Sequence, residues 1–234
     1  MITVMDPDAA RTALTAGRLS CPQPGCGGIL RVWSRARLRQ VRGPGGVVEQ
    51  VRPDRARCRT CQVTQVLLPA GCLPRRAYTV EVVGAALQAA AEGAGCARAA
   101  AAAGAPAATV RGWLRAVSRS VPTLTAQAIV VAEAAGHASA CWLRPRRTGT
   151  ALAEAVNALG AAARAFHLVL ATSRPSGSGG TLTGIDYLAL VAERHRGSLL
   201  HRLRLVDPTG LAAHAPPWQL INVITAGRLL APSG

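Results

Sequence analysis

Two pairs of cysteines constrain the fold of this 234-residue chain more than any other feature of its sequence. The first pair is Cys21 and Cys26, and the second pair is Cys58 and Cys61. Such pairs, brought together by a β-hairpin, can surround a Zn²⁺ ion tetrahedrally with four thiolates. Because a small β unit has little apolar core, the bound metal would supply much of its folding free energy. We therefore predict a structural Zn²⁺ site with these four ligands.

The segment between the two pairs has the pattern of a hairpin. Residues 29–41 alternate apolar and basic side chains, the Gly-Pro-Gly-Gly sequence of residues 43–46 forms a turn, and residues 47–51 begin a return strand. Residues 62–68 offer a third strand, which Pro69 ends. Residues 21–74 are thus typical of a zinc ribbon. The alternative is a redox dithiol at the second cysteine pair, although no βαβ pattern surrounds it.

The remaining three cysteines are scattered along the chain and are not paired. They are Cys72, Cys96 and Cys141. We interpret them as small, semi-buried side chains rather than metal ligands.

Residues 75–121 predict three helices joined by short turns. Thr79 can cap the first helix, and the alanine-rich residues 96–103 form a short second helix. Gly104 makes a tight turn, and Pro106 suits the start of a third helix. The apolar residues of that third helix recur at helical spacing and face the core: Val110, Trp113, Leu114 and Val117. This arrangement predicts a helix-turn-helix.

The outward face of the third helix has the composition of a DNA-reading surface. Small residues at its start, Ala107 and Ala108, would let the helix enter the major groove, where Arg111 and Arg115 could reach guanine edges or phosphates. The residues that we expect to contact DNA are Arg98, Ala107, Ala108, Thr109, Arg111, Gly112, Arg115 and Arg119. The alternative is an ordinary three-helix bundle with a solvated arginine face.

The charge balance points to the same class of partner. All 27 cationic side chains are arginine, and the formal net charge is +16. Residues 29–61 alone carry nine arginines against Glu49 and Asp54. This excess favours a polyanion, and nucleic acid is the polyanion that fits a helix-turn-helix.

Residues 21–121 resemble the zinc-ribbon plus helix-turn-helix proteins that accompany insertion sequences in actinobacteria. They are similar to the N-terminal DNA-binding part of transposases and to an uncharacterised actinobacterial domain family. The matching pieces are the two cysteine pairs, Val66-Leu-Leu-Pro69, Leu73-Pro-Arg-Arg-Ala-Tyr78 and Thr109-Val-Arg-Gly-Trp-Leu-Arg115. The resemblance implies DNA binding in a mobile-element or regulatory context. The four-residue gap of the first cysteine pair and the alanine run of residues 99–103 depart from that pattern.

Residues 122–234 are rich in alanine and glycine and have no role that the sequence identifies. We expect helices at residues 150–165 and 185–196 and a strand at residues 203–206. A transposase cuts DNA with three carboxylates, an Asp–Asp–Glu series on strand ends, that hold two metal ions. The carboxylates of this region do not form such a series: Glu133, Glu154, Asp186, Glu193 and Asp207. The five histidines also show no pair at metal-ligand spacing. Because neither the carboxylates nor the histidines form a catalytic set, we predict no catalytic residues. Residues 218–230 are expected to pack against the domain or to associate with a partner.

These observations lead to an α+β fold class: a leader at residues 1–20 with a short helix, a zinc ribbon at 21–74, a helix-turn-helix at 75–121 and a helix-rich region at 122–234. We expect a non-catalytic, transposase-associated or regulatory DNA-binding protein. The alternatives are a zinc-ribbon adaptor that docks on RNA polymerase or a recombinase and, less favoured, a transposase enzyme.

The expected partners are DNA and, besides it, a second copy of the chain or a transposase or recombinase. Residues 1–18 contain Asp6 and Asp8 and lack the apolar core of a signal peptide. The longest uncharged stretch, residues 208–227, is interrupted by prolines and glycines, so we expect no membrane span. The expected location is the cytoplasm, with nucleoid association when DNA is bound.

Overall fold

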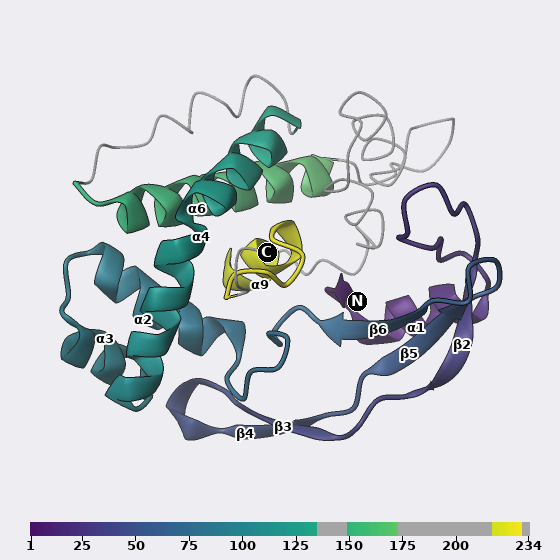
Figure 1. The fold of residues 1–234 in the computed structure, drawn as a ribbon, viewed down its shortest axis with the longest axis horizontal. Coiled ribbons are helices and arrows are strands. Elements are labelled where there is room, and N and C mark those ends of the chain that lie inside the picture. Colours follow the sequence, from purple (N-terminus) through teal and green to yellow (C-terminus); the bar gives the residue numbers. More distant parts are fainter. Residues whose placement is uncertain (135–148, 173–216, 231–234) are drawn as a thin grey trace.

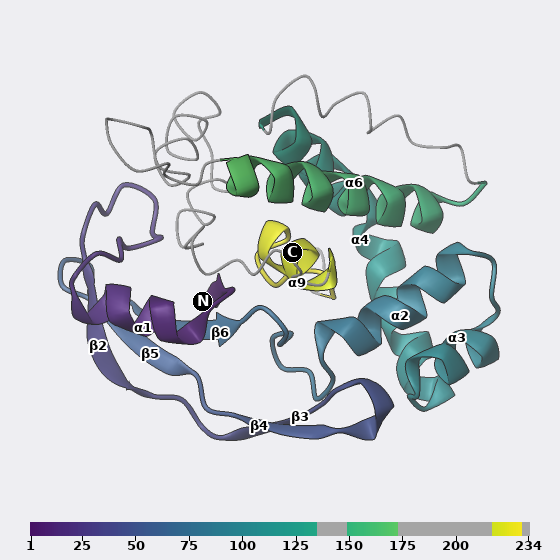
Figure 2. The same cartoon turned by 180° about the vertical axis from the view of Figure 1, so that it is seen from behind.

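The computed structural model describes residues 1–134, 149–172 and 217–230, and it has the mixed helix and strand content of an α+β fold (Figure 1). In chain order the elements are β1 Ile2–Val4, α1 Pro7–Thr15, β2 Leu30–Arg35, β3 Arg39–Arg42, the 3₁₀ turn Pro44–Gly46, β4 Val48–Val51, β5 Asp54–Cys58, β6 Thr64–Pro69, α2 Val80–Ala91, α3 Cys96–Ala103, α4 Ala107–Ala134, α6 Ala151–Thr172 and α9 Pro217–Ile224. The strands β2, β5 and β6 lie at one end of the molecule and the helices α2 and α3 at the other, in both views (Figures 1 and 2). The predicted fold class is confirmed.

The strands form two sheets. A four-stranded sheet has the order β1-β6-β5-β2, in which β1 runs parallel to β6 and the other pairs are antiparallel. Strands β3 and β4 form a separate two-stranded sheet across the predicted glycine-rich turn. The predicted hairpin and third strand are therefore present, but each arm of the hairpin is interrupted. Pro53 lies at one interruption, where it cannot donate to a ladder.

Residues 1–20 belong to the four-stranded sheet through β1 and pack on it through α1. The Asp6 carboxylate accepts hydrogen bonds from the amides of Asp8 and Ala9 and so caps α1. Helix α1 buries Ala10 and Leu14 on one face of the sheet, in a core that includes residues of β1, β2, β5 and β6. The short helix was predicted, whereas β1 was not.

The helices α2, α3 and α4 match the predicted trihelical unit. Gly104 has φ 60° and ψ 35°, the left-handed conformation that ends α3 and that glycine adopts without steric cost. Val110, Trp113 and Val117 are buried and Leu114 is half-buried, as the helical spacing predicts. Thr79 occupies the N-cap of α2, but its side chain makes no capping hydrogen bond.

Helix α4 does not end at the predicted boundary after residue 121. It continues through Pro122 to Ala134, and its second half packs on α6, which includes the predicted helix at residues 150–165. Leu124, Ala128 and Val131 are buried there.

The C-terminal segment fills the centre of the molecule. Helix α9 lies between the sheet and the helices in both views, and Leu220, Ile221 and Ile224 are buried in the main core (Figures 1 and 2). Of the two expectations for residues 218–230, packing against the domain is therefore what the structure shows. The helix expected at 185–196 and the strand expected at 203–206 lie outside the described residues, and Cys141 and the five histidines lie where no side chain is described.

Candidate metal centre and candidate nucleic-acid interface

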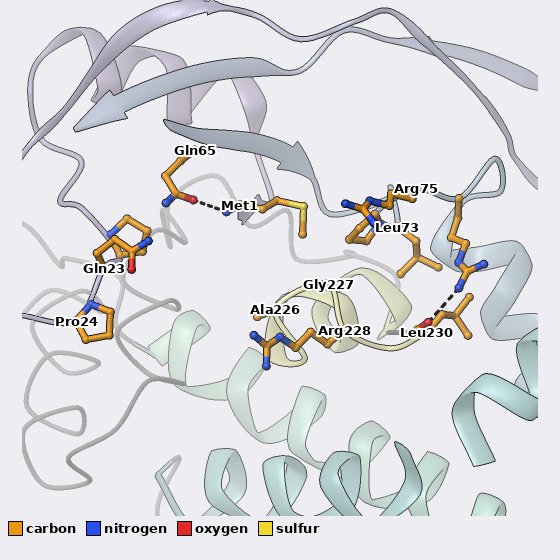
Figure 3. Close-up of a pocket in the computed structure, with 13 residues that line it drawn as sticks. Met1, Gln23, Pro24, Gln65, Leu73, Arg75, Ala226, Gly227, Arg228 and Leu230 are labelled. Carbon is orange, nitrogen blue, oxygen red and sulfur yellow. Dashed lines mark hydrogen bonds between the residues drawn. The ribbon is translucent and has the colours of Figure 1, made fainter. Parts of the chain in front are cut away.

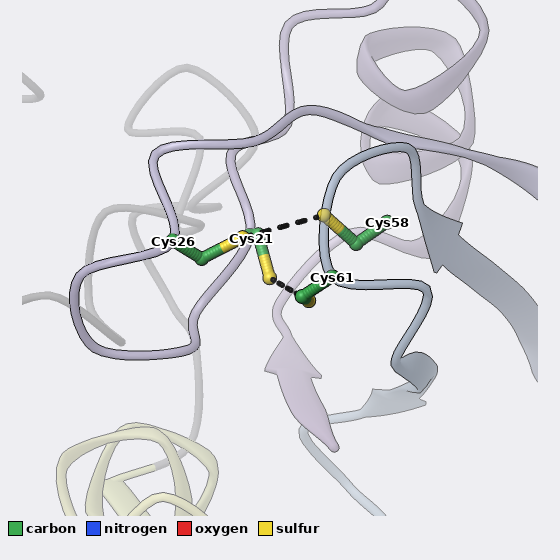
Figure 4. A group of neighbouring side chains, drawn as sticks. All are labelled: Cys21, Cys26, Cys58 and Cys61. Carbon is green, nitrogen blue, oxygen red and sulfur yellow. Dashed lines mark hydrogen bonds between the residues drawn. The ribbon is translucent and has the colours of Figure 1, made fainter.

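The four predicted metal ligands come together at one end of the ribbon. Cys21 and Cys26 lie on the loop between α1 and β2, Cys58 ends β5, and Cys61 lies in the turn before β6. Their Sγ atoms all lie within 4.8 Å of one another (Figure 4). The Cys21–Cys61 and Cys26–Cys58 Sγ–Sγ distances are both 3.6 Å. The hairpin thus joins the two pairs, and the four cysteines are close enough to bind a metal ion.

Backbone hydrogen bonds hold the two cysteine-bearing loops in place. The Cys21 amide donates to the Gly28 carbonyl at 2.7 Å, which closes the first loop. The Arg59 amide donates to the Ile29 carbonyl at 3.0 Å, which ties the second loop to the first. The position of the sulfurs therefore follows from the strand pairing of β2 with β5.

The two glycines after Cys26 are required by this geometry. Gly27 has φ +60°, in the left-handed region. A Cβ atom on Gly28 would lie 2.5 Å from Thr60 Oγ1 and 2.7 Å from Cys58 Sγ. Only a residue without a side chain fits there while Cys58 keeps its position.

The four thiols differ in acidity. Burial by itself raises the pKa of Cys58, but the amides of Cys61 and Thr60 donate to its sulfur, and the net effect lowers that pKa from 9.0 to about 6. Burial raises the pKa of Cys21 to about 12, although the Gln23 amide opposes the change. A bound divalent cation would supply the positive charge that four neighbouring thiolates need.

The predicted DNA-contacting residues lie at the start of α4 and on α3. Those on α4 that are exposed are Ala107, Ala108, Arg111, Gly112, Arg115 and Arg119. Arg98 on α3 is also exposed, Thr109 is half-buried, and Arg119 Nε donates to the Arg115 carbonyl at 3.2 Å. The predicted outward face is thus the exposed face of the helix. Its contact with DNA stays a prediction.

The arginine-rich hairpin that the sequence predicts contains one cluster of basic side chains around Trp33. The guanidinium carbon atoms of Arg31 and Arg57 lie 5.6 and 4.6 Å from the centre of the Trp33 ring. Arg31 and Trp33 are two residues apart in β2, so their alternation in the sequence indicates a shared face. The approach of Arg57 depends on the register of β5 against β2, which the sequence alone does not determine.

A cavity of about 590 Å³ lies between the first cysteine loop and the C-terminal turn (Figure 3). Arg75, Arg76 and Arg228 line it. Arg76 donates to the Leu230 carbonyl at 3.1 Å, so this side chain holds the C-terminal turn against the segment that follows β6.

The described residues define an α+β chain with a candidate four-cysteine metal centre beside a trihelical unit. A family model described as a domain of unknown function (DUF6431) matches residues 21–113, from the first of the four cysteines to Trp113 in α4. No curated protein and no solved structure matches the chain. Among the described residues, no helix is long and apolar enough to cross a membrane.

Proposed function

We propose that this chain is a DNA-binding protein in which the first turns of α4 enter the major groove. The observation that carries the proposal is the division of α4 into two faces. Trp113 and its apolar neighbours are buried, whereas Ala107, Ala108, Arg111 and Arg115 are exposed together. A helix with small residues at its N-terminal end can approach base edges closely, and arginine is the residue that most often reads guanine.

The support around α4 favours a reading helix over a solvated bundle. Trp113 is 4% exposed and meets the Tyr78 ring edge-on, with ring centroids 5.1 Å apart, so the helix is anchored directly behind its arginines. No acidic residue lies in the first turn of α4 to repel phosphates. The whole chain carries a net charge of +16, which supports attraction to a polyanion.

We further propose that the metal is Zn²⁺ and that its role is structural. At a Zn–S distance of about 2.3 Å, a tetrahedron of sulfurs has edges of about 3.8 Å. Two of the sulfur pairs are 3.6 Å apart and all pairs are within 4.8 Å, so a small adjustment completes the site. An all-thiolate set favours zinc over harder cations such as Mg²⁺.

Purified protein should therefore contain about one zinc ion per chain, because a four-thiolate site binds zinc tightly. Cys58→Ser should release the metal and unfold the ribbon, as elemental analysis and circular dichroism would show. Cys96→Ser is the matched control, since Cys96 lies on α3 and outside the cluster. Metal-free parent protein with an intact fold would contradict this proposal.

The proposed role is targeting or regulation in the cytoplasm, with no DNA-cleaving step of its own. Of the five carboxylates that the sequence offers as catalytic candidates, only that of Glu154 belongs to a described side chain, and this side chain is exposed on α6. An adaptor that docks on a protein partner is the competing function. Measuring DNA binding over a series of salt concentrations separates the two, because an adaptor has weak, non-specific affinity for DNA.

The decisive experiment is competitive selection from a random duplex library with single-arginine variants. Arg111→Ala should cost about 1–3 kcal/mol at the selected site and relax preference at one base position. Arg115→Ala should weaken all sequences alike and reduce the salt slope by about one unit. Arg164→Ala, at an exposed position on α6, is the control for charge alone. If Arg111→Ala selects the same motif as stringently as the parent, α4 is not the reading helix.

A further inference from the structure

The four-stranded sheet has two unlike faces. Helix α1 packs on one of them, and Asp54 belongs to that covered side, where its carboxylate accepts from Arg11 on α1 at 3.0 Å. Asp54 is the only acidic residue in the four strands of the sheet. Because successive side chains of a strand point to opposite faces, Arg55 and Arg57 belong to the other side.

That other side places two like charges directly opposite each other. Arg31 in β2 is paired in register with Arg57 in β5, an arrangement that destabilises an antiparallel pair. Neither arginine has an acidic partner among the described residues. The Trp33 ring takes the place of a counter-charge, since both guanidinium groups lie within 5.6 Å of its centre.

We propose that this surface, the Trp33 face formed by Arg31, Trp33 and Arg57, binds the phosphodiester backbone of duplex DNA as a second contact site. The proposal rests on the proposed DNA-binding function and extends it from α4 to the ribbon. The Trp33 side chain is 47% exposed, so the face is open to a ligand. An anion between the two arginines supplies the counter-charge that the sheet itself lacks.

The chemistry of the face suits phosphate in particular. Stacking on an aromatic ring orders a guanidinium group and leaves its edge free to donate a forked pair of hydrogen bonds, which matches a phosphate. Arg57 is ordered further because its Nε donates to the Gln62 carbonyl at 3.2 Å. The terminal nitrogens of Arg57 remain as donors for a ligand.

An acidic protein is the other class of partner that such a face could bind. Protein interfaces are enriched in both tryptophan and arginine, but their buried centre is depleted of charged residues as a whole. Here the aromatic ring is bracketed by guanidinium groups, so the centre of the patch presents cations rather than apolar area. This arrangement favours the phosphate backbone.

The test measures binding of the full-length, zinc-loaded protein to a labelled duplex and to the matching single strand by fluorescence anisotropy over a series of salt concentrations. Removing Arg31 and Arg57 together, as Arg31→Ala with Arg57→Ala, should reduce the log–log salt slope on duplex by about 1.8 units. The control is Arg18→Ala with Arg164→Ala, which removes two exposed charges away from this face and should leave the slope nearly unchanged.

The Trp33→Leu variant separates two contributions of the face to binding: the ordering of the guanidinium groups by the ring, and their positive charge. It should weaken duplex binding about two- to five-fold at fixed salt and leave the salt slope unchanged, because it removes the ring and no cation. Zinc content and circular dichroism verify that each variant is folded. This second variant keeps the test decisive if the double arginine variant does not fold.

The outcomes distinguish this inference from the proposed function. If the parent binds duplex but the double arginine variant behaves like its control, the inference is wrong and the proposed function stands. Arg111→Ala could leave the selected motif unchanged while the double arginine variant has a smaller salt slope than the parent. In that case the Trp33 face binds DNA and the reading role of α4 is wrong. A stronger effect on single-stranded DNA than on duplex contradicts the duplex assignment. An effect on binding to a polyglutamate peptide, without one on DNA, points to an acidic protein instead.

Discussion

Among the glycines that the structure describes, Gly84 has the least room for a side chain, and it gives a prediction that is independent of ligands. Gly84 lies in α2 where the Trp218 ring of α9 crosses it. An ideal Cβ atom on Gly84 would lie 2.2, 2.3 and 2.4 Å from three atoms of that ring, whereas ordinary contacts are 3.4–4 Å. In Gly84→Ala the ring must therefore move by more than 1 Å, or α2 and α9 must separate.

The size of the effect follows from two opposing terms. Alanine in place of glycine inside a helix is favourable by about 1 kcal/mol, whereas forcing an extra carbon into a close-packed core costs about 1–3 kcal/mol. Gly112→Ala reports the helix-propensity contribution alone, because Gly112 is also helical but a Cβ atom on it would have nothing within 4 Å. Gly84→Ala should thus be about 1–3 kcal/mol less stable than Gly112→Ala.

The free energy of unfolding is measured by urea titration with circular dichroism, in reducing buffer with zinc present. A double-mutant cycle with Trp218→Ala completes the test, since in that background the added methyl group has room and Gly84→Ala should be neutral or stabilising. Equal stability of Gly84→Ala and Gly112→Ala in the parent background would refute the packing of α9 on α2.

Two further predictions concern cysteines. Gly28→Ala should weaken metal binding in a chelator competition, because its Cβ would lie 2.7 Å from Cys58 Sγ. The control is Gly95→Ala, whose Cβ would have nothing within 4 Å and which should leave the metal affinity unchanged. Equal metal affinities of the two variants would contradict the geometry of the site. Burial raises the pKa of Cys72 from 9.0 to about 11, so little of it is thiolate at pH 8, and iodoacetamide should label it more slowly than the half-exposed Cys96 in native protein. The two rates should converge in urea, and faster labelling of native Cys72 would contradict its burial.

Local signals account for the parts of the fold that the sequence predicts. The cysteine spacing, the glycine-rich turn of the hairpin and Gly104 each determine the conformation of a few neighbouring residues. The apolar spacing of α4 likewise identifies its buried face from residues within two turns. The metal cluster was predictable because one hairpin is enough to bring its two halves together.

Contacts between distant residues account for the parts that were missed. Strand β1 exists because Ile2 pairs with Leu67, and its three residues carry too little signal to predict a strand. Helix α4 continues past Pro122, where the local rule predicts a break, because its second half is buried against α6. The Trp33 face depends on the β2–β5 register, which includes an irregularity between Val32 and Ser34.

Helix α9 connects the two surfaces that we propose for DNA. The buried Asn222 side chain donates to the carbonyls of Ala70 and Cys72 at 2.7 and 3.0 Å, beside the end of β6. On the other side, Gln219 donates to Glu81 on α2 at 2.7 Å. One short helix thus bonds to the end of the ribbon and to the trihelical unit, and it holds their relative position.

A final prediction follows from this connection. If α4 and the Trp33 face bind one duplex together, their combined affinity depends on a fixed separation, as for any linked pair of sites. Gly84→Ala, which disturbs α9 without removing a charge, should then lower affinity for a long duplex more than for one that spans the α4 site alone. The comparison is made by anisotropy under conditions where circular dichroism shows the variant folded. Equal losses on both duplexes would show that the two surfaces do not act on the same DNA molecule, because a lost linkage affects only the longer one.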